Sequence, residues 1–265
     1  MKVLFVLAHP EPQSLSASLC RVAVDALRAE GHETMVTDLY ADGWKAVVDR
    51  EDFPALAAET RLRVPAASGE AFASGTLTED VASEQAKLRA ADALILAFPL
   101  WWFSMPAILK GWIDRVYSHG FAYGVGEHSD RRWGDRYGEG MLAGKRAMLM
   151  VTSGGWETHY GPRGINGPID DLLFPIQHGM LFYPGYEVLP PFVTYRADRL
   201  DAAGFDAAAE RLEERMRTLF TTVPLPYRHQ NGGDYLIPSM ELQPSIEPGQ
   251  AGFSVHLREP AGSGA

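Results

Sequence analysis

A strand–helix–strand pattern over the first 39 residues constrains the fold of this chain most strongly. Residues 3–8 are a continuous apolar run of strand length. From Leu15 apolar residues recur at helical spacing until Gly31, a natural residue for ending a helix, and residues 34–39 predict a second strand. Because the helix forms a crossover between the two strands, the pattern predicts that they pair in parallel.

The alternation of strands and helices continues to about residue 220. Residues 93–98 are apolar at every position, which is typical of a parallel strand buried on both faces. Further strands are expected at 147–151 and 186–195, which makes five in all. Further helices are expected at residues 79–90, 105–117, 169–181 and 205–220. The pattern predicts an α/β fold with a doubly wound, five-stranded parallel sheet.

Three segments lack this regularity. Residues 41–78 show no sustained period and predict an excursion with short helices, and the Gly-rich, charged residues 124–145 predict a surface loop. From residue 222 the chain is rich in Pro, Gly and Gln and has no period. We therefore expect one domain over residues 1–221 and an irregular C-terminal extension over residues 222–265, packed on that domain or on a partner subunit.

The charge and the cysteine content exclude several classes of protein. A formal net charge of −10 disfavours nucleic acids and anionic membranes as partners, because both are polyanions. The single cysteine, Cys20, allows no internal disulfide and no cysteine-based metal cluster. The first apolar run is too short for a secretory signal, and no stretch approaches the roughly 20 apolar residues that span a bilayer. The expectation is a cytoplasmic protein without membrane insertion.

Three of the predicted strands end in chemically distinctive segments, at residues 9–18, 99–106 and 152–167. In a doubly wound sheet, ligands bind outside the carboxyl ends of the strands. The first of these strand exits leads into a helix N-terminus, where free backbone N–H groups and the helix dipole suit a phosphate. His9 adds a donor, and Ser14 and Ser16 add hydroxyls. A turn with capping serines is the alternative for this exit taken alone.

The other two exits are suited to a planar ring. Pro99-Leu100-Trp101-Trp102-Phe103 puts three aromatic rings where the sheet ends, and an aromatic wall suits a stacked heterocycle, although such rings are also used in cores. The run Thr152-Ser153-Gly154-Gly155 offers two residues without Cβ atoms, which allow close backbone approach, although alone it predicts only a turn. Together the three exits predict a flavin site.

Several motifs resemble one family, the flavodoxin-like NAD(P)H:quinone oxidoreductases. They are Ala8-His9-Pro10, Asp38-Leu39-Tyr40, Phe98-Pro99-Leu100-Trp101-Trp102-Phe103, Pro106-Ala107-Ile108-Leu109-Lys110-Gly111-Trp112, Gly120-Phe121-Ala122-Tyr123 and Pro175-Ile176-Gln177-His178-Gly179. The similarity covers residues 1–226 in order, and Gly252-Phe253-Ser254-Val255 echoes the family's C-terminal extension. The resemblance implies a flavodoxin-like fold and a homodimer that holds FAD between its subunits. It also implies a ping-pong relay of hydride from NADH or NADPH to a quinone.

The resemblance assigns roles residue by residue. It implies FAD phosphate binding by His9, Ser14, Leu15 and Ser16, and an approach of Arg63 to the dinucleotide. Pro99, Leu100, Trp101, Trp102 and Phe103 would line the isoalloxazine, with loop amides directed to its edge. Thr152, Ser153, Gly154 and Gly155 would hold its pyrimidine end, and Tyr160 would lie at the ring carbonyl. Trp102, Phe103, Tyr123 and Tyr183 would contact the substrate.

Three departures from the family pattern change these expectations. Asn166 stands where the family has the His that partners the Tyr, and an amide does not titrate near neutrality, so Tyr160, water or the weaker candidate His159 must carry any proton. One branch of the family binds a metal with the His at 178. Here the companion positions are Phe182 and Tyr227, so we expect no metal. Val125 replaces a family Tyr and suggests a different acceptor pocket.

Other functions stay open at this stage. Nitro and azo compounds are alternative acceptors at the same site. Some bacterial relatives are ancillary regulators of glutathione-gated potassium efflux channels, which would require a membrane partner. A one-electron flavodoxin-type carrier is disfavoured by the aromatic loop and the long extension, and FMN is the less favoured cofactor. The sequence does not identify the physiological acceptor or choose between NADH and NADPH.

Overall fold

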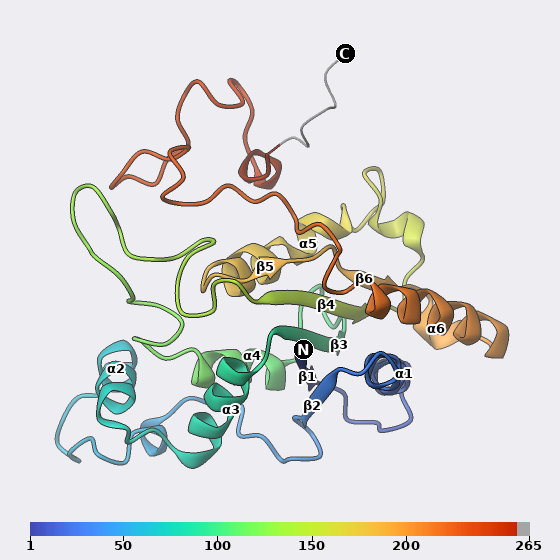
Figure 1. Ribbon diagram of the computed structural model, residues 1–265, viewed down its shortest axis with the longest axis horizontal. Helices are drawn as coiled ribbons and strands as arrows, with labels where there is room; N and C mark the ends of the chain where they lie inside the picture. The colour runs from blue at the N-terminus through green and yellow to red at the C-terminus, as the bar shows by residue number, and fades with distance from the viewer. Residues whose placement is uncertain (259–265) are drawn as a thin grey trace.

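The computed structural model describes residues 1–258 and is built around one parallel sheet with the strand order β2-β1-β3-β4-β5. A sixth strand, β6, also pairs with β4, and all pairings are parallel. The strands are β1 (Lys2–Leu7), β2 (Glu33–Asp38), β3 (Ala93–Pro99), β4 (Arg146–Thr152), β5 (Glu187–Val188) and β6 (Phe192–Thr194). Because β1 lies between β2 and β3, the winding direction reverses there (Figure 1). The predicted doubly wound parallel sheet is confirmed.

The fifth predicted strand, at 186–195, is two short strands rather than one. Pro190 and Pro191 lie between β5 and β6 and have no N–H to donate to a sheet ladder. Both pieces pair with β4, with Val188 beside Ala147 and Val193 beside Val151. The sequence prediction of five strands therefore becomes a five-stranded path with one added strand.

The helices match the predicted segments, with shifted ends. They are α1 (Leu15–Ala29), α2 (Val64–Ser74), α3 (Glu79–Ala90), α4 (Ala107–Val116), α5 (Ile169–Ile176) and α6 (Ala202–Arg217). The helix predicted at 205–220 begins earlier because Asp201 caps it, its carboxylate accepting from the Gly204 amide at 2.8 Å. The helix predicted at 169–181 changes at its end into the π-helical turn η3 (Gln177–Phe182).

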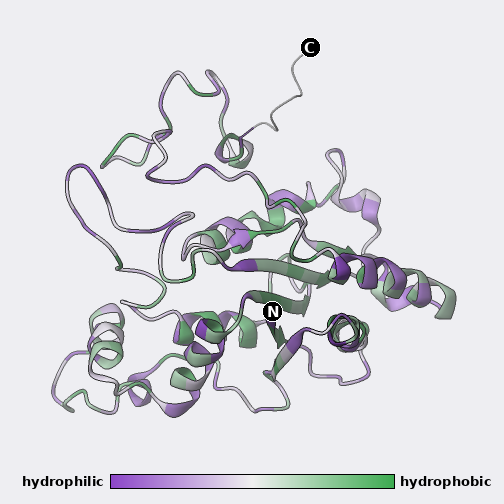
Figure 2. Cartoon of the chain, in the orientation of Figure 1, coloured by the Kyte–Doolittle hydropathy of each residue, from purple (hydrophilic) through white to green (hydrophobic). Residues whose placement is uncertain are grey.

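Hydrophobic side chains pack on both faces of the sheet. Leu4 and Val6 of β1 join the core under α3, α4 and α5, whereas Val3 and Phe5 join the core under α1 and α6. This alternation follows from the two-residue period of a strand. Figure 1 shows α1 and α6 on one side of the sheet and α3 and α4 on the other. Strands β3 and β4 are mostly hydrophobic along their length, while α6 mixes the two colours (Figure 2).

A buried ion pair fastens the excursion at 41–78 to the sheet domain. The guanidinium of Arg115, on α4, lies 2.8 Å from the carboxylate of Asp52, in the short 3-10 helix η1 (Arg50–Asp52), and both side chains are almost fully buried. The same guanidinium lies 4.6 Å from the centre of the Trp44 ring and pairs with Asp80. These contacts explain why a segment without a hydrophobic period is ordered.

Replacing Arg115 with Met is expected to lower the free energy of unfolding by about 3 kcal/mol. The change removes the guanidinium from the buried Asp52 carboxylate and leaves it the Asp49 amide, at 2.9 Å, and the more distant Lys45 ammonium, at 3.6 Å. A poorly compensated buried charge is costly. Lys110→Met on the same helix is the matched control, because Lys110 pairs with Asp114 in solvent and should cost less than about 1 kcal/mol. Urea unfolding of both variants checks this prediction. An equal loss in the free energy of unfolding in the two variants would contradict it.

The described part of the C-terminal extension packs on its own chain. The Leu225 amide donates to the carbonyl of Val188 at the sheet edge, and Tyr227 and Val255 are buried. Arg228 is buried and paired with Asp234 at 3.1 Å and with Glu247 at 3.2 Å. The extension therefore covers the loop at 124–145 and η3 (Figure 1). The end of the predicted extension, 259–265, lies outside the described residues.

Candidate functional site

The three strand exits meet at one edge of the sheet, next to the point where the winding reverses. The hydroxyls of Ser16 and Thr152 lie 2.7 Å apart, which joins the first exit to the third. The Leu100 amide donates to the Thr152 carbonyl at 2.8 Å, and the rings of His9 and Trp101 lie 6.0 Å apart. Residues more than 130 positions apart thus form one continuous surface, at the place where such sheets bind ligands.

The first exit presents the start of a 15-residue helix. Ser14 caps α1, its hydroxyl accepting from the Ala17 amide at 3.2 Å, while the buried Ser16 hydroxyl is engaged with Thr152. The amides of Leu15 and Ser16 precede any intrahelical bond and so offer donors at the positive end of the helix dipole. The two serine side chains are therefore engaged within the chain, and the free donors of this exit are backbone amides.

The imidazole of His9 is held in a fixed orientation beside this helix start. Its Nδ1 accepts from the Glu11 amide at 3.0 Å. A neutral ring that accepts at Nδ1 carries its proton at Nε2, so Nε2 is a donor. His9 can therefore add one hydrogen bond to an anion at the first exit.

The second exit is a two-residue hairpin that displays aromatic rings to solvent. Trp101 and Ser104 exchange two backbone hydrogen bonds of 3.0 Å, and the residues between them, Trp102 and Phe103, have φ values of 48° and 63°. The Trp102 side chain is 94% exposed and that of Phe103 48%. Positive φ at a large residue costs on the order of 1–3 kcal/mol, and strain of this kind concentrates at functional sites. The hairpin therefore holds two large rings on the surface, accessible from outside the chain.

The third exit is organised around Tyr160. The Ser153 hydroxyl donates to the phenol oxygen of Tyr160 at 2.9 Å, which leaves the phenol proton free for another acceptor. A Cβ atom at Gly155 would lie 2.8 Å from the Tyr160 ring, and one at Gly154 would lie 2.8 Å from the Asp198 carboxylate. Packing within the chain thus requires a glycine at 155, whereas at 154 the exposed Asp198 side chain can turn aside.

Asn166 lies close to Tyr160 in the chain but has a less defined role. Its amide N–H donates to the His159 carbonyl at 3.0 Å, and its side chain is half-buried. His159 itself is exposed. The backbone therefore holds Asn166 near the third exit, and the catalytic role suggested by the resemblance stays a prediction.

Three residues assigned by resemblance lie away from the exits of their own chain. Arg63 is exposed at the start of α2, and the Tyr123 ring packs edge-on against His119, which also contacts α2. Tyr183 packs against Tyr137, 4.9 Å away. In Figure 1, α2 lies at the side of the sheet from which β4 starts, opposite the tip of its arrow. A single chain does not bring these residues to the strand exits.

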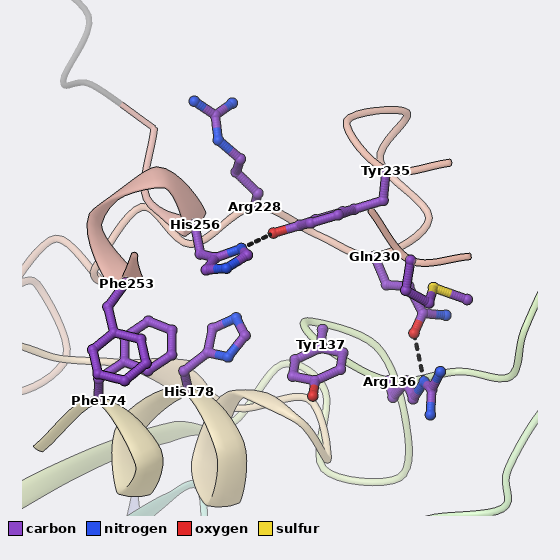
Figure 3. A pocket seen from close by; sticks show the side chains of 10 residues that line it. Arg136, Tyr137, Phe174, His178, Arg228, Gln230, Tyr235, Phe253 and His256 are labelled. Carbon is purple, nitrogen blue, oxygen red and sulfur yellow. Dashed lines mark hydrogen bonds between the residues drawn. The ribbon is translucent and has the colours of Figure 1, made fainter. Parts of the chain in front are cut away.

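A second cluster of functional side chains was missed in the sequence. Figure 3 shows a cavity of about 340 Å³ between the loop at 124–145, α5 with η3, and the C-terminal extension. It is lined by Arg136, Tyr137, Phe174, His178, Arg228, Gln230, Tyr235, Met240, Phe253 and His256. Because these residues come from three segments that are irregular or far apart in sequence, no local pattern could group them.

His178 lies in this cavity among aromatic rings rather than metal ligands. The rings of Phe182 and Tyr227, at the companion positions of the family's metal-binding branch, lie 5.5 and 5.0 Å from it. In residues 1–258 no group of three or more His, Cys, Asp or Glu side chains is arranged for a metal ion. The Nε2 atom of His178 is buried without a hydrogen-bond partner among those residues.

Burial, reinforced by the nearby His256, lowers the pKa of His178 from 6.5 to about 4. Between these values the unfolded chain takes up a proton that the folded protein does not, so stability falls as the pH drops from about 6.5 towards 4. Over this pH range the free energy of unfolding of His178→Phe should therefore fall less than that of the parent. The difference should be about 3 kcal/mol or less, because the ring is only partly buried. Urea unfolding at several pH values tests this. In the control His128→Phe, at an exposed position, the free energy of unfolding should change with pH as in the parent. The same pH dependence in His178→Phe and the parent would contradict the prediction.

Comparisons with known proteins agree with this geometry. A family model described as a flavodoxin-like fold matches residues 1–216. A ribosyldihydronicotinamide dehydrogenase-like protein of Penicillium crustosum is 59% identical, over 97% of this chain and 96% of its own. The human ribosyldihydronicotinamide dehydrogenase [quinone] is 37% identical, over 85% and 94%. A solved structure from Klebsiella pneumoniae, provisionally described as a quinone reductase, is 61% identical with a TM-score of 0.95, over 97% and 100%.

The sheet is doubly wound, and a helix start, an aromatic hairpin and a Gly-Gly turn meet at its carboxyl edge. This architecture is that of a flavodoxin-like protein. The chain belongs to this family, in the branch that contains the ribosyldihydronicotinamide and NAD(P)H quinone dehydrogenases. The family resemblance seen in the sequence is confirmed. Among the described residues, no helix combines the length and the apolar character needed to cross a bilayer.

Proposed function

We propose that this protein is an FAD-dependent two-electron reductase. In this proposal it takes hydride from NADH or NADPH and passes it to a quinone, or to a similar flat electron-poor acceptor, by a ping-pong mechanism. The observation that carries the proposal is the contact of all three strand exits, which puts phosphate donors, exposed rings and Tyr160 on one surface. The names of the relatives support the reaction type.

The residues of this surface fit a flavin. The backbone amides at the start of α1 and the His9 Nε2 suit the phosphates, and the exposed hairpin rings suit a flat heterocycle. The amides of Leu100 and Trp101 are engaged within the chain, so those of Trp102 and Phe103 are the loop donors that suit ring acceptors. Bound there, a flavin supplies the two-electron chemistry.

The chain's own residues then have three tasks. The exposed rings of Trp102 and Phe103 exclude water from the reacting face. Thr152 and Ser153 fix the third exit, and Ser153 orients the Tyr160 phenol. Tyr160 donates a hydrogen bond where negative charge develops on reduction, which is electrostatic stabilisation of the kind seen in oxyanion holes. With Asn166 in place of a His, the proton comes from Tyr160 or from water.

We further propose a homodimer as the working unit. Trp102 and Ile165, of the second and third exits, are 94% and 91% exposed, and a second copy would cover these large hydrophobic side chains. A second copy that covers this edge would bring its own Arg63, Tyr123 and Tyr183 to the site, where one chain cannot place them. Obligate interfaces of this type bury more than roughly 2,000 Å². A cytoplasmic location stays a prediction from the sequence.

One preparation tests the cofactor, the reaction and the assembly. The purified protein, reconstituted with flavin if needed, should show a flavin spectrum that NADH or NADPH bleaches and a quinone restores. Heating should release FAD, and light scattering should give the mass of two chains. Recovery of FMN alone would refute the FAD assignment, and a monomer that turns over would refute the dimer. A flavin that neither nucleotide bleaches would refute the reductase itself.

Two alternatives use the same flavin site. Nitro and azo compounds are flat, electron-poor acceptors, and competition with a quinone in steady-state assays separates them. An ancillary role in glutathione-gated potassium efflux would require capture by membranes that contain the channel. Identification of the flavin released on heating decides between FMN and FAD.

A further inference from the structure

We propose that the cavity beneath the C-terminal extension is a second ligand-binding site, and that it takes an aromatic carboxylic acid. Within one chain, no residue of the three strand exits lines this cavity. At about 340 Å³, the cavity lies in the size range of small-molecule sites, which are mostly apolar with a few well-placed polar groups. Its lining has that composition.

Two rows of rings face one another across the cavity (Figure 3). In the first row Phe253, Phe174, His178 and Tyr137 stack in sequence, with centroid distances of 4.3, 4.6 and 4.8 Å. In the second row Tyr235 and His256 lie end to end, with 18° between their planes and the Tyr235 hydroxyl against the His256 ring (Figure 3). Across the cavity, His256 lies 5.7 Å from His178 at 34° and 6.0 Å from Phe174 at 38°, closer than a sandwiched ring requires. The two rows therefore give the cavity an aromatic lining, which favours an aromatic ligand.

Arg136 supplies the positive charge that an acid requires. Its Nε donates to the Gln230 side-chain oxygen at 2.5 Å, and its guanidinium lies 5.7 Å from the centre of the Tyr183 ring. Among residues 1–258 it has no carboxylate partner, whereas Arg228, the other arginine of the cavity, is neutralised by Asp234 and Glu247. A half-buried guanidinium held by an amide keeps its remaining N–H donors for a bidentate partner such as a carboxylate.

His178 lines the cavity with its ring but keeps its unpartnered polar atom beneath the surface. Its Nε2 is buried and has no hydrogen-bond partner in the described part of the chain, although buried polar atoms are nearly always satisfied. Its ring points from η3 towards His256 and Tyr137, into the space between the two rows (Figure 3). This atom has almost no accessible surface, so it lies beneath the lining rather than in reach of a ligand. The cavity thus favours an aromatic ligand with one negative charge.

The extension forms one wall of the site. Tyr235, Met240, Phe253 and His256 all belong to it, and the Tyr235 hydroxyl lies 2.8 Å from the His256 Nδ1. A chain that ended with the sheet domain would keep only Phe174, His178 and Tyr137 of these rings, as an open aromatic surface. The site therefore gives the extension a role that the three strand exits do not require.

Calorimetric titration of the full-length protein, with its flavin, tests the proposal. The probes are 1-naphthoate and, as its neutral match, 1-naphthamide. We expect one naphthoate per chain, bound at least tenfold more tightly than the amide, since charge-assisted hydrogen bonds are about twice as strong as neutral ones. Arg136→Gln should weaken naphthoate at least tenfold and leave the amide unchanged. Arg131→Gln, on the exposed part of the same loop, should change neither.

A second variant protects the test against misfolding. Phe253→Trp, at the rim of the cavity, should fill part of the cavity and weaken the binding of both probes. Arg136→Gln should weaken the binding of naphthoate alone. Equal affinity of the two probes, or naphthoate binding that survives both variants, would overturn the proposal. Flavin absorbance is recorded on the same samples. A protein that binds naphthoate but holds no reducible flavin would retain this site and lose the proposed reductase function.

Discussion

Replacing Trp102 and Phe103 with Asn and Gly is expected to stabilise the flavin-free protein while weakening its affinity for flavin about a hundredfold. The two residues adopt the positive φ values that a type I′ hairpin requires, and Asn-Gly is the favoured pair for that turn. Relief of the strain should raise the free energy of unfolding by about 1–2 kcal/mol. Loss of the exposed rings removes a stacking surface worth roughly 2–3 kcal/mol of flavin binding.

Urea unfolding without flavin and a fluorescence titration with FAD measure the two effects. Trp133→Asn is the matched control, because Trp133 is also exposed, at 40%, but lies in the loop at 124–145. It should leave flavin affinity unchanged. A double variant that is less stable than the parent without flavin would show that the hairpin is unstrained. A variant that keeps full affinity would show that these rings do not bind the cofactor.

Tyr160→Phe is expected to slow flavin reduction by NADH or NADPH ten- to hundredfold. The phenol accepts from Ser153, so its own proton is free to be donated where charge develops, and a hydrogen bond to a charged acceptor is worth about 1.5–3 kcal/mol. At about 1.4 kcal/mol per tenfold, this sets the expected range. Stopped-flow reduction measures the rate. Ser153→Ala removes the orienting bond but keeps the proton, and should cost less than tenfold.

Asn166→His extends the same test to proton transfer. The parent should show no inflection from an imidazole at this position, and the variant should gain one near the unperturbed histidine pKa of about 6.5. The pH profile of flavin reduction is the measurement. If Tyr160→Phe reduces as fast as the parent, Tyr160 has no catalytic role, and the site contracts to the three strand exits as a flavin cradle.

The sequence predicted the parts of this protein that depend on local order. A fully apolar run such as 93–98 can be satisfied only inside a sheet covered on both faces, and alternating strands and helices leave few topologies besides a doubly wound one. The three strand exits were predictable for the same reason, since the carboxyl ends of parallel strands share an edge. The contacts of Ser16 with Thr152 and of His9 with Trp101 show that these strand ends lie together.

Local patterns were less informative at the ends of elements. The Pro190-Pro191 break and the Asp201 cap depend on single residues whose effect on pairing or capping is decided by the neighbouring backbone. The change of α5 into a π-helical turn leaves no periodicity that separates it from an ordinary helix. These differences shift boundaries without changing the fold.

Only the tertiary structure decided which side chains serve structure and which remain available. Ser14 and Ser16 suggest phosphate ligands in sequence, yet one caps a helix and the other binds Thr152. Arg136 and Arg228 are equivalent in sequence, yet Arg228 is neutralised by Asp234 and Glu247, whereas Arg136 pairs with no carboxylate in the described chain. The sequence determines which groups a chain carries and how each segment folds. Whether a polar group is satisfied depends on partners from three to more than a hundred residues away, and only the folded chain decides which of them it meets.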